Sequence, residues 1–324
     1  MRLALAEAEK GRGRTHPNPV VGALVVRGGR VIASGHHQKA GLPHAEVNVL
    51  RRAGARARGA DVYVTLEPCD HHGRTPPCTE SLIAAGVRRV FFGSPDPNPL
   101  VDGHGARRLR RAGIEVHPGV VRGACDASNE AWFKFITKGL PWVVLKAAVT
   151  LDGKLATRSG DPKWISSEPA RRLVHRWRNE LDAVLVGAGT VRADDPLLTV
   201  RGVPKGRNPA RVVLGKIPPR ARLLREPGET IREEGPLAGV LRRLAQRGIT
   251  SVLVEGGAGV HGEFLEAGLW DELRLFVAPK VFGSGAPSWA GYTGSPIENL
   301  ELRSVERVGS DALLTVRPVR SRGR

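Results

Sequence analysis

Short apolar runs alternate with amphipathic segments along most of this chain. Apolar runs of about four to eight residues, bounded by Gly, Pro or polar residues, are typical of strands, whereas apolar residues three or four positions apart are typical of helices. In the first part of the chain, these patterns predict strands at residues 20–26, 31–34, 61–66, 88–92 and 114–117. They predict helices at residues 44–53, 78–85, 103–112 and 122–137, and an amphipathic segment at residues 1–14.

The same alternation resumes after a loop at residues 138–141, which favours a domain boundary there. Beyond it, strands are expected at residues 142–149, 183–186, 210–214, 250–254, 273–278 and 312–316, and helices at residues 168–178 and 237–247. Strands that alternate with helices indicate a layered α/β sheet. We therefore expect two α/β domains, residues 1–140 and 141–324, which agrees with the usual domain size for a chain of 324 residues.

The composition is that of a protein of a reducing, aqueous compartment. No apolar run approaches the roughly 20 residues that a membrane-spanning helix requires. Residues 1–14 lack the continuous apolar stretch of a signal peptide. The chain has three cysteines, too few for a disulfide framework. We expect a cytoplasmic protein without a membrane partner.

The formal net charge is +18, and arginine supplies most of the basic residues. A strongly basic chain is a reason to consider nucleic acid as a partner. The arginines are scattered, however, aromatic residues make up 5% of the chain, and no RNA-binding aromatic motif is present. We therefore expect a solvated basic surface, with no nucleic acid partner, in which some of the charge serves a phosphate-bearing substrate.

A His-Ala-Glu triplet at residues 44–46, followed by Pro68-Cys69 and by Cys78, has the composition of a catalytic zinc site. One imidazole nitrogen and two thiolate sulfurs suit a tetrahedral zinc ion, and three protein ligands leave a fourth position for water. Glu46 lies too close to His44 to be needed as a ligand, and it is placed to carry protons between that water and a ring nitrogen. The arrangement is typical of zinc deaminases that act on heterocyclic bases.

The alternative is a structural zinc site, which would take a fourth Cys or His nearby. The remaining cysteine, Cys125, lies far downstream. The spacing also departs from the C-x-x-C of nucleobase deaminases, because eight residues separate Cys69 from Cys78. This polar and basic insert is expected to line a substrate pocket beside the metal. His44 and Cys78 are both expected at helix N-termini, where the helix dipole favours a thiolate.

A glycine-rich segment at residues 257–262 follows an expected strand and contains G-x-G-x-x-G. Such glycines let the backbone approach a phosphate, and the N–H groups of a following helix can bind it. The acidic residue that a Rossmann site places about 20 residues later is missing. The segment is therefore either a phosphate cradle of another nucleotide-binding fold or an ordinary tight turn.

Longer motifs, taken together, resemble one enzyme family. In the first half they are Thr15-His16-Pro17-Asn18, Pro43-His44-Ala45-Glu46, Thr65-Leu66-Glu67-Pro68-Cys69 and Asp96-Pro97-Asn98. In the second half they lie at residues 146–154, 190–199 and 254–257. Over nearly its whole length, the chain resembles the bifunctional pyrimidine deaminase/reductase family of riboflavin biosynthesis. The resemblance implies a cytidine-deaminase-like α/β/α domain followed by a dihydrofolate-reductase-like α/β domain.

This resemblance implies two consecutive reactions on a small phosphoribosyl pyrimidine. The first domain, with one Zn²⁺, would hydrolyse the 2-amino group of 2,5-diamino-6-ribosylamino-4(3H)-pyrimidinone 5′-phosphate. The second would use NADPH to reduce the ribosyl group, giving 5-amino-6-(5-phosphoribitylamino)uracil. A homo-oligomer is also expected, of a size that the residues do not indicate.

Residues that match the family's functional positions fall into four groups. His44, Cys69 and Cys78 would bind zinc, with Glu46 as the catalytic acid and base. The deaminase pocket would comprise Asn18, His37, His71, Arg74, Asp96 and Asn98. The NADPH site would comprise Ala148, Trp164, Thr190, Asp194, Gly257, Ala258, Gly259, Val260, His261, Gly262 and Glu263. The reductase substrate would contact Lys146, Pro162, Arg178, Leu198, Arg201 and Glu255.

Three departures from the family pattern concern the reductase half. Pro162 stands where relatives usually carry Ser, and Lys216 replaces a small polar residue on the cofactor side. Residues 224–237 are shorter than usual, which predicts a sheet edge that lacks a peripheral strand.

Two other functions stay open at this point. The zinc motif and the charge also suit a tRNA-type adenosine deaminase, and a zinc-stabilised basic binding module is the alternative outside enzymology. Neither explains the nucleotide-site motifs that follow Lys146.

Overall fold

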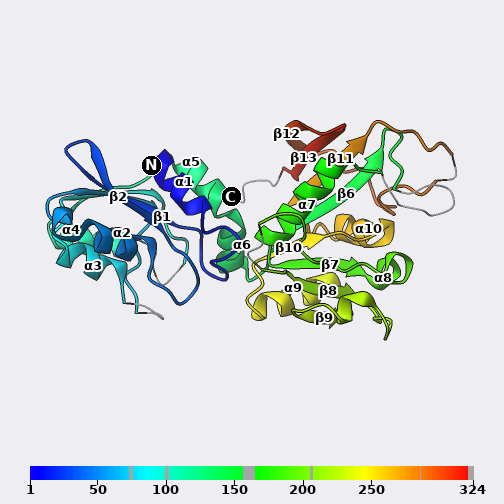
Figure 1. The fold of residues 1–324 in the computed structure, drawn as a ribbon, viewed down its shortest axis with the longest axis horizontal. Coiled ribbons are helices and arrows are strands. Elements are labelled where there is room, and N and C mark those ends of the chain that lie inside the picture. Colours follow the sequence, from blue (N-terminus) through cyan, green and yellow to red (C-terminus); the bar gives the residue numbers. More distant parts are fainter. Residues whose placement is uncertain are drawn as a thin grey trace. The chain divides into compact units, whose positions relative to one another are not determined.

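The computed structural model describes residues 1–72, 76–98, 101, 103–155, 165–204, 207–284 and 286–319. The chain forms two compact units, Met1–Gly139 and Leu140–Arg324, each built around its own sheet (Figure 1). The predicted class, layered α/β in both halves, is confirmed.

The first unit has three layers, α/β/α. Its sheet has the strand order β2-β1-β3-β4-β5, in which β1 runs antiparallel to β2 and β3, whereas β3, β4 and β5 are parallel. The strands are β1 (Gly22–Arg27), β2 (Arg30–His36), β3 (Asp61–Leu66), β4 (Arg89–Ser94) and β5 (Glu115–His117). The core between the layers is apolar, with Val62, Val64 and Val90 fully buried.

Helices cover both faces of this sheet. One face carries α2 (Ala45–Ala53), the short 3₁₀ helix η1 (Gly54–Ala57), α3 (Cys78–Ala84) and α4 (His104–Arg111). The other face carries α1 (Arg2–Glu9) and α5 (Arg122–Ser128), and α6 (Glu130–Lys138) follows α5. The apolar stripe of α2, which includes Val49 and Leu50, is buried against the sheet, as its helical periodicity predicts.

The helical prediction at residues 122–137 is confirmed, with a break at Asn129 that divides the segment into α5 and α6. Asn129 is 3% exposed, and its side chain pairs with the backbone of Val20 in both directions. Its Oδ1 accepts from the N–H of Val20 at 2.8 Å, and its Nδ2 donates to the carbonyl of Val20 at 2.9 Å. This pairing satisfies the backbone of Val20, which the prediction had included in a strand, and the strand begins at Gly22 instead.

The second unit has one sheet of eight strands in the order β12-β13-β11-β6-β10-β7-β8-β9. Strands β11, β6, β10, β7, β8 and β9 are parallel, and the β12–β13 hairpin adds two antiparallel strands at one edge. The strands are β6 (Trp142–Thr150), β7 (Ala183–Gly187), β8 (Ala210–Leu214), β9 (Thr230–Glu233), β10 (Ser251–Val254), β11 (Glu272–Ala278), β12 (Leu300–Val308) and β13 (Asp311–Pro318).

Helices α9 (Leu237–Gln246) and α10 (Ala258–Glu266) pack on one face of this sheet. Helices α7 (Glu168–Glu180) and α8 (Ala188–Asp194) pack on the other, and a 3₁₀ turn, η2 (Arg222–Leu224), precedes β9. Central strands such as β7 are buried along their whole length, which is why they read as continuous apolar runs.

Two edge strands depart from the sequence predictions. The stretch 224–237, expected to lack a peripheral strand, contributes β9, which pairs in parallel with β8 at the sheet edge. Strand β12 was not predicted at all, because most of its residues are exposed and charged residues interrupt the apolar alternation.

No helix in the described part of the chain is both long enough and apolar enough to cross a bilayer.

Two helical glycines allow a direct test of how tightly α4 is packed. A Cβ on Gly105 of α4 would overlap the carbonyl oxygen of Pro68, which immediately precedes Cys69. A Cβ on Gly123, at the equivalent second position of α5, would meet no atom within 4 Å. We expect Gly105→Ala to lower the free energy of unfolding by about 1–3 kcal/mol through overpacking. We expect Gly123→Ala to be neutral or to raise it by about 0.4–1 kcal/mol. Denaturant unfolding of both variants checks this, and equal effects would contradict the packing described here.

Candidate active sites

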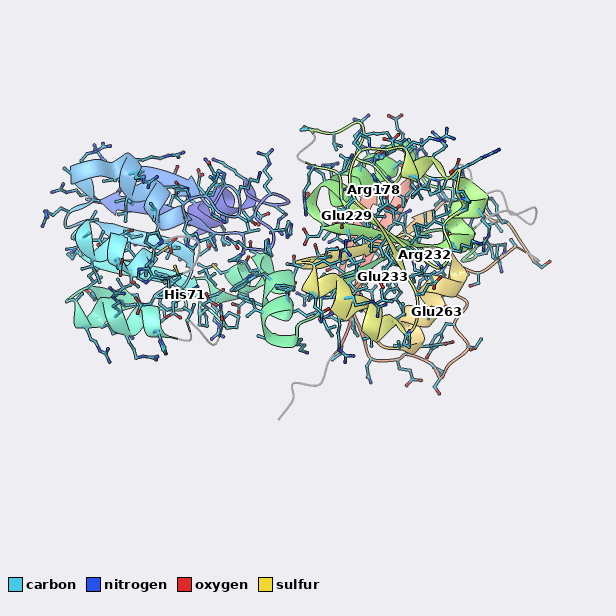
Figure 2. All side chains as sticks on the ribbon, turned by 90° about the horizontal axis from the view of Figure 1, so that it is seen from below. His71, Arg178, Glu229, Arg232, Glu233 and Glu263 are labelled. Atoms are coloured by element: carbon cyan, nitrogen blue, oxygen red, sulfur yellow. The ribbon has the colours of Figure 1, made fainter. Side chains whose placement is uncertain are left out.

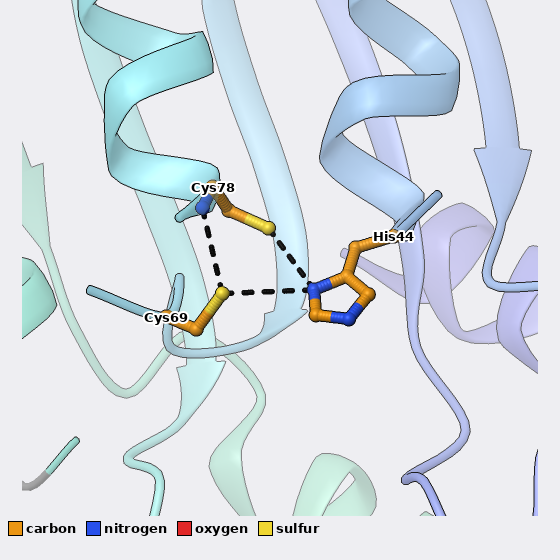
Figure 3. Close-up of side chains that lie close together, drawn as sticks. All are labelled: His44, Cys69 and Cys78. Carbon is orange, nitrogen blue, oxygen red and sulfur yellow. Dashed lines mark hydrogen bonds between the residues drawn. The ribbon is translucent and has the colours of Figure 1, made fainter. Parts of the chain in front are cut away.

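Three ligand-type side chains converge at the carboxyl end of β3 in the first unit. His44 is the N-cap of α2, Cys78 is the first residue of α3, and Cys69 lies in the loop after β3 (Figure 3). The Nδ1 atom of His44 is 3.2 Å from the Sγ of Cys78 and 3.6 Å from the Sγ of Cys69. In a tetrahedral zinc site with Zn–N and Zn–S distances of about 2.1 and 2.3 Å, N and S ligand atoms lie roughly 3.6 Å apart. The three side chains therefore have the spacing that a zinc ion requires.

The ligand set leaves room for a substrate or water. Among the described residues, the group arranged to hold a metal ion consists of His44, Cys69 and Cys78, without a carboxylate or a second imidazole. One nitrogen and two sulfurs are the donors of a catalytic rather than a closed structural zinc site. The predicted helix N-termini of His44 and Cys78 are confirmed.

The surroundings of Cys69 favour a thiolate. Hydrogen bonding from the Cys78 side chain, together with His44 and the Cys78 backbone N–H 3.4 Å away, lowers the pKa of Cys69 to about 4. Cys69 is therefore prepared to bind a cation at neutral pH.

Glu46 lies in the first turn of α2 and is 4% exposed. Burial raises the pKa of Glu46 to about 7, and the nearby Cys69 charge adds to the shift. A carboxyl group with a pKa near neutrality is suited to both accept and release protons.

A cavity of about 300 Å³ joins the metal ligands to the predicted deaminase pocket. Every described residue assigned to that pocket lines it, and so do Glu46 and two of the zinc ligands: Asn18, His37, His44, Glu46, Cys69, His71, Asp96 and Asn98. Arg74 lies outside the described residues.

The cavity also has an apolar wall that the sequence analysis did not assign. Trp132, Phe135 and Ile136 of α6 line it on spacings of three and four residues. That periodicity is visible in the sequence, but it is the same signal that a core-facing helix gives. The wall provides a surface against which a flat ring can pack.

Asp96 reaches the cavity from the end of β4 and is 6% exposed. Its carboxylate accepts a hydrogen bond from the backbone N–H of Asn98 at 2.8 Å, which closes a tight turn and holds the Asp96 side chain in place. Burial raises the pKa of Asp96 to about 7, and the charges of Glu67 and Cys69 contribute.

A second cavity, also about 300 Å³, lies in the second unit at the carboxyl ends of parallel strands. Its lining includes eight of the residues assigned to the reductase: Lys146, Ala148, Arg178, Thr190, Asp194, Leu198, Glu255 and Gly257. Ligands of open α/β sheets bind at this edge, since the chain leaves the sheet there in loops. Ser166 and Arg171 line the same cavity and were not assigned from the sequence.

An ion pair whose side chains are 12% and 11% exposed, Arg178 with Glu255, lines this second cavity. The Nε and Nη2 atoms of Arg178 donate to the Glu255 carboxylate at 2.6 and 2.9 Å, and Nη1 donates to the carbonyl of Thr199 at 3.1 Å. Burial alone would raise the pKa of Glu255, yet Arg178 and Lys146 hold it below its ordinary value. Burial lowers the pKa of Lys146, which the Glu255 charge partly offsets.

Leu198 has a φ of +54° in this cavity, in the left-handed region that a bulky side chain rarely adopts. It is also 2% exposed, so the surrounding core holds the backbone in this conformation. Backbone strain of this kind is often found at residues that contact a ligand.

The glycine-rich segment begins a helix and is not a tight turn. Gly257 is the N-cap of α10, which follows β10 directly, and Gly256 and Gly257 line the cavity. A Cβ on Gly257 would fill the space 3.7 Å from Oγ1 of Thr190. The open backbone and the N–H groups of α10 therefore fit a phosphate of a nucleotide cofactor.

The later residues of the segment lie within α10 and do not line the cavity. His261 is buried with its ring centroid 5.8 Å from that of Trp289, and a Cβ on Gly262 would come within 2.6 Å of the carbonyl oxygen of Gly291. Ala258, Gly259 and Val260 form the first turn. Glu263 is exposed and lies well apart from Arg178 (Figure 2).

The remaining reductase assignments fall elsewhere. Arg201 and Lys216 are exposed and do not line the cavity. Pro162 and Trp164 lie outside the described residues.

Both halves of the chain match known families. Residues 1–94 match the family described as cytidine and deoxycytidylate deaminase zinc-binding region, and residues 141–314 match the RibD C-terminal domain. The chain is 43% identical to the riboflavin biosynthesis protein RibD of Aquifex aeolicus, over 97% of this chain and 96% of that protein. It is 44% identical to RibD of Mycobacterium tuberculosis, over 98% of this chain and 96% of that protein.

Solved structures agree over the whole length. The structure is similar to Acinetobacter baumannii RibD, with a TM-score of 0.94, 39% identity and 98% of each chain covered. It is also similar to a diaminohydroxyphosphoribosylaminopyrimidine deaminase/5-amino-6-(5-phosphoribosylamino)uracil reductase from Thermotoga maritima. There the TM-score is 0.91 and the identity 41%, over 98% of this chain and 97% of that chain.

The three cysteines allow a matched test of the metal site. We expect the purified protein to hold about one zinc ion per chain and Cys69→Ser to lose it, because a neutral hydroxyl replaces a thiolate ligand. Cys125→Ser should keep the metal, since Cys125 is buried apart from the ligand group. Elemental analysis after dialysis measures both. Retention of zinc by Cys69→Ser would refute the proposed ligand set.

Proposed function

The chain belongs to the RibD family of riboflavin biosynthesis proteins, and from this membership we propose which residues carry its two reactions. It is a bifunctional enzyme with a zinc-binding deaminase domain and a reductase domain. We propose that the first domain, residues 1–140, removes the 2-amino group of 2,5-diamino-6-ribosylamino-4(3H)-pyrimidinone 5′-phosphate. The second, residues 141–324, reduces the ribosyl group with NADPH. The observation that carries this proposal is the convergence of His44, Cys69 and Cys78 beside a cavity that Glu46 also lines.

In the deaminase site, the roles follow from the chemistry of the side chains. Zinc held by His44, Cys69 and Cys78 supplies, when bound, a polarised water of lowered pKa. Glu46 would move protons twice. It would take one from the water and deliver it to the ring nitrogen next to the reacting carbon, and then take the proton of the hydroxyl now on that carbon and deliver it to the departing ammonia. Its buried position in the same cavity as the ligands supports this role.

The remaining deaminase residues bind and orient the substrate. Asn18, Asp96 and Asn98 present amide and carboxyl groups that read the ring edges. His71 and Arg74 are the basic groups of the assigned pocket that would meet the phosphate, and His37 completes the pocket beside Asn18. The wall of Trp132, Phe135 and Ile136 packs against the ring face.

In the reductase site, the protein mainly holds the cofactor and the substrate in the relative orientation that hydride transfer requires. NADPH supplies the hydride when it is bound. Gly257 and the first turn of α10, residues 258–260, would bind a cofactor phosphate, and Ala148, Thr190 and Asp194, with Trp164, would complete the cofactor side. Residues 261–263 would support that turn from within α10. Lys146, Arg178, Leu198 and Glu255, with Pro162 and Arg201, orient the ribosyl phosphate.

We further propose a cytoplasmic homo-oligomer without a nucleic acid partner. Exposed apolar side chains on β12, among them Leu300, Leu302 and Val305, support self-association. Basic side chains engaged by carboxylates, such as Arg89 with Asp61 and Arg243 with Glu233, support a solvated surface rather than a phosphate-binding groove.

The role of Glu46 is tested by Glu46→Gln. The variant keeps the shape of the side chain and should keep zinc, but it cannot exchange a proton at neutral pH. We expect kcat for ammonia release to fall by about 10²–10⁴-fold. Turnover of the diaminopyrimidine phosphate and zinc content are measured together, and wild-type turnover with zinc present would exclude the role.

The ion pair in the reductase cavity is tested against an exposed pair of the same chemistry. Glu255→Gln removes the charge that faces Arg178 and Lys146, and Glu229→Gln removes the partner of Arg247 in an exposed ion pair.

We expect Glu255→Gln to lower kcat/KM for NADPH oxidation about tenfold or more, because a buried charge-assisted hydrogen bond is lost. Glu229→Gln should leave it unchanged. The assay uses the deaminated intermediate, with ammonia release from the first site as the internal control. Equal effects of the two variants would refute a role for the buried pair.

A further inference from the structure

His37 follows β2 and is 2% exposed, although it borders the deaminase cavity. Both of its ring nitrogens lie within hydrogen-bond distance of protein groups. Nδ1 is 3.2 Å from the carbonyl oxygen of Pro43, and Nε2 is 3.1 Å from Nδ2 of Asn18. Neither nitrogen is therefore left to bind a substrate.

The direction of these hydrogen bonds follows from which groups can donate. A carbonyl oxygen only accepts, so the Nδ1 of His37 must carry the proton that meets Pro43. In a neutral imidazole the other nitrogen, Nε2, is then an acceptor. Only the NH₂ side of the Asn18 amide can satisfy it. The orientation of Asn18 is thus set by donor and acceptor chemistry and not by the similar shapes of its two amide atoms.

The carbonyl of Pro43, which accepts the hydrogen bond from His37, is itself held in place. Nδ2 of Asn48 donates to the carbonyls of His36 and Pro43, at 2.9 and 3.3 Å. Pro43 directly precedes the zinc ligand His44, whose ring meets that of His37 edge to face with centroids 5.2 Å apart. The position of Asn18 is therefore tied to the same loop that places the metal.

We propose that His37 is a positioning residue that turns the amide oxygen of Asn18 toward the cavity, making Asn18 an acceptor for an N–H group of the pyrimidine. This rests on the deaminase function proposed above. Among the described residues, no hydrogen bond is found to Oδ1 of Asn18, which belongs to a side chain that lines the cavity. His37 acts through Asn18 and does not bind the substrate itself.

The fixed orientation of the Asn18 amide allows the site to distinguish between types of pyrimidine ring. A pyrimidinone ring presents a ring N–H and amino groups, which Oδ1 of Asn18 can accept. The diaminopyrimidinone has one ring N–H and one unprotonated nitrogen beside its amino-bearing carbon, whereas a cytosine-type nucleoside ring has no ring N–H. Where Oδ1 of Asn18 meets the N–H position, an unprotonated nitrogen would set two acceptors against each other. Leaving buried polar groups without partners is costly, so this contact favours rings that offer a donor.

A double-mutant cycle tests the proposal in the full-length, zinc-loaded protein. We expect His37→Leu and Asn18→Ala each to raise KM for ammonia release about tenfold or more, with smaller effects on kcat. Because His37 acts through Asn18, the double variant should be no worse than Asn18→Ala alone. His37→Gln should restore most of the loss, since its side-chain amide both donates and accepts.

Two results of this cycle would overturn the proposal. Additive effects of the two substitutions would mean that His37 contacts the substrate independently. An unchanged KM in His37→Leu would mean that the orientation of Asn18 does not depend on His37.

A second measurement does not depend on turnover. In protein labelled with ¹⁵N-histidine, the His37 signals, identified by their loss in His37→Gln, should show a protonated Nδ1 and an unprotonated Nε2 at neutral pH. A proton on Nε2 would overturn the proposal even if His37→Leu fails to fold. If the wild-type protein releases no ammonia from the diaminopyrimidine phosphate, the proposed function fails, while the tautomer still decides the role of His37.

Discussion

The coordination of one metal ion by His44, Cys69 and Cys78 requires three separate segments to meet within a few ångström. Two of these segments are helix N-termini, and the third is the loop that leaves β3. Hydrogen bonds elsewhere in the first unit help to hold these segments in place. Glu67 accepts hydrogen bonds from the backbone N–H groups of Ala106, at 3.0 Å, and Asp96, at 3.5 Å. The start of α4 and the loop after β4 are thereby fixed against the residues that carry Cys69.

The metal motif, the helix N-termini and the α/β layers were predictable, because each is a local pattern whose physical meaning does not depend on distant residues. The break in the helix at Asn129 was not predictable, because it is caused by a pair of hydrogen bonds to Val20, more than a hundred positions away in the chain. Strand β12 was missed for a related reason: an exposed edge strand need not alternate apolar and polar residues.

Site residues were predictable to different degrees. Glu46, which we propose as the catalytic acid and base, stands at a recognisable spacing from the metal ligands, so the sequence alone marks it. The wall formed by Trp132, Phe135 and Ile136 carries only an apolar helical stripe, which core helices share. In the second unit, Arg178 and Glu255 are 77 positions apart in the chain, and the fold of the parallel sheet brings their charges together. Burying both charges is costly, and retaining them favours a role beyond stability.

The side chain of Asn129 has a consequence for how this enzyme tolerates changes in chain length. It anchors the start of α6 to Val20, two residues after Asn18. The number of residues between Asn129 and the aromatic wall therefore decides which side chains of α6 face the deaminase cavity. Each residue turns an α-helix by about 100°. One inserted or deleted residue between Asn129 and Trp132 would therefore rotate the aromatic wall out of the cavity. Similar changes before Asn129, in the turn that leads into α5, would be absorbed without reaching the substrate.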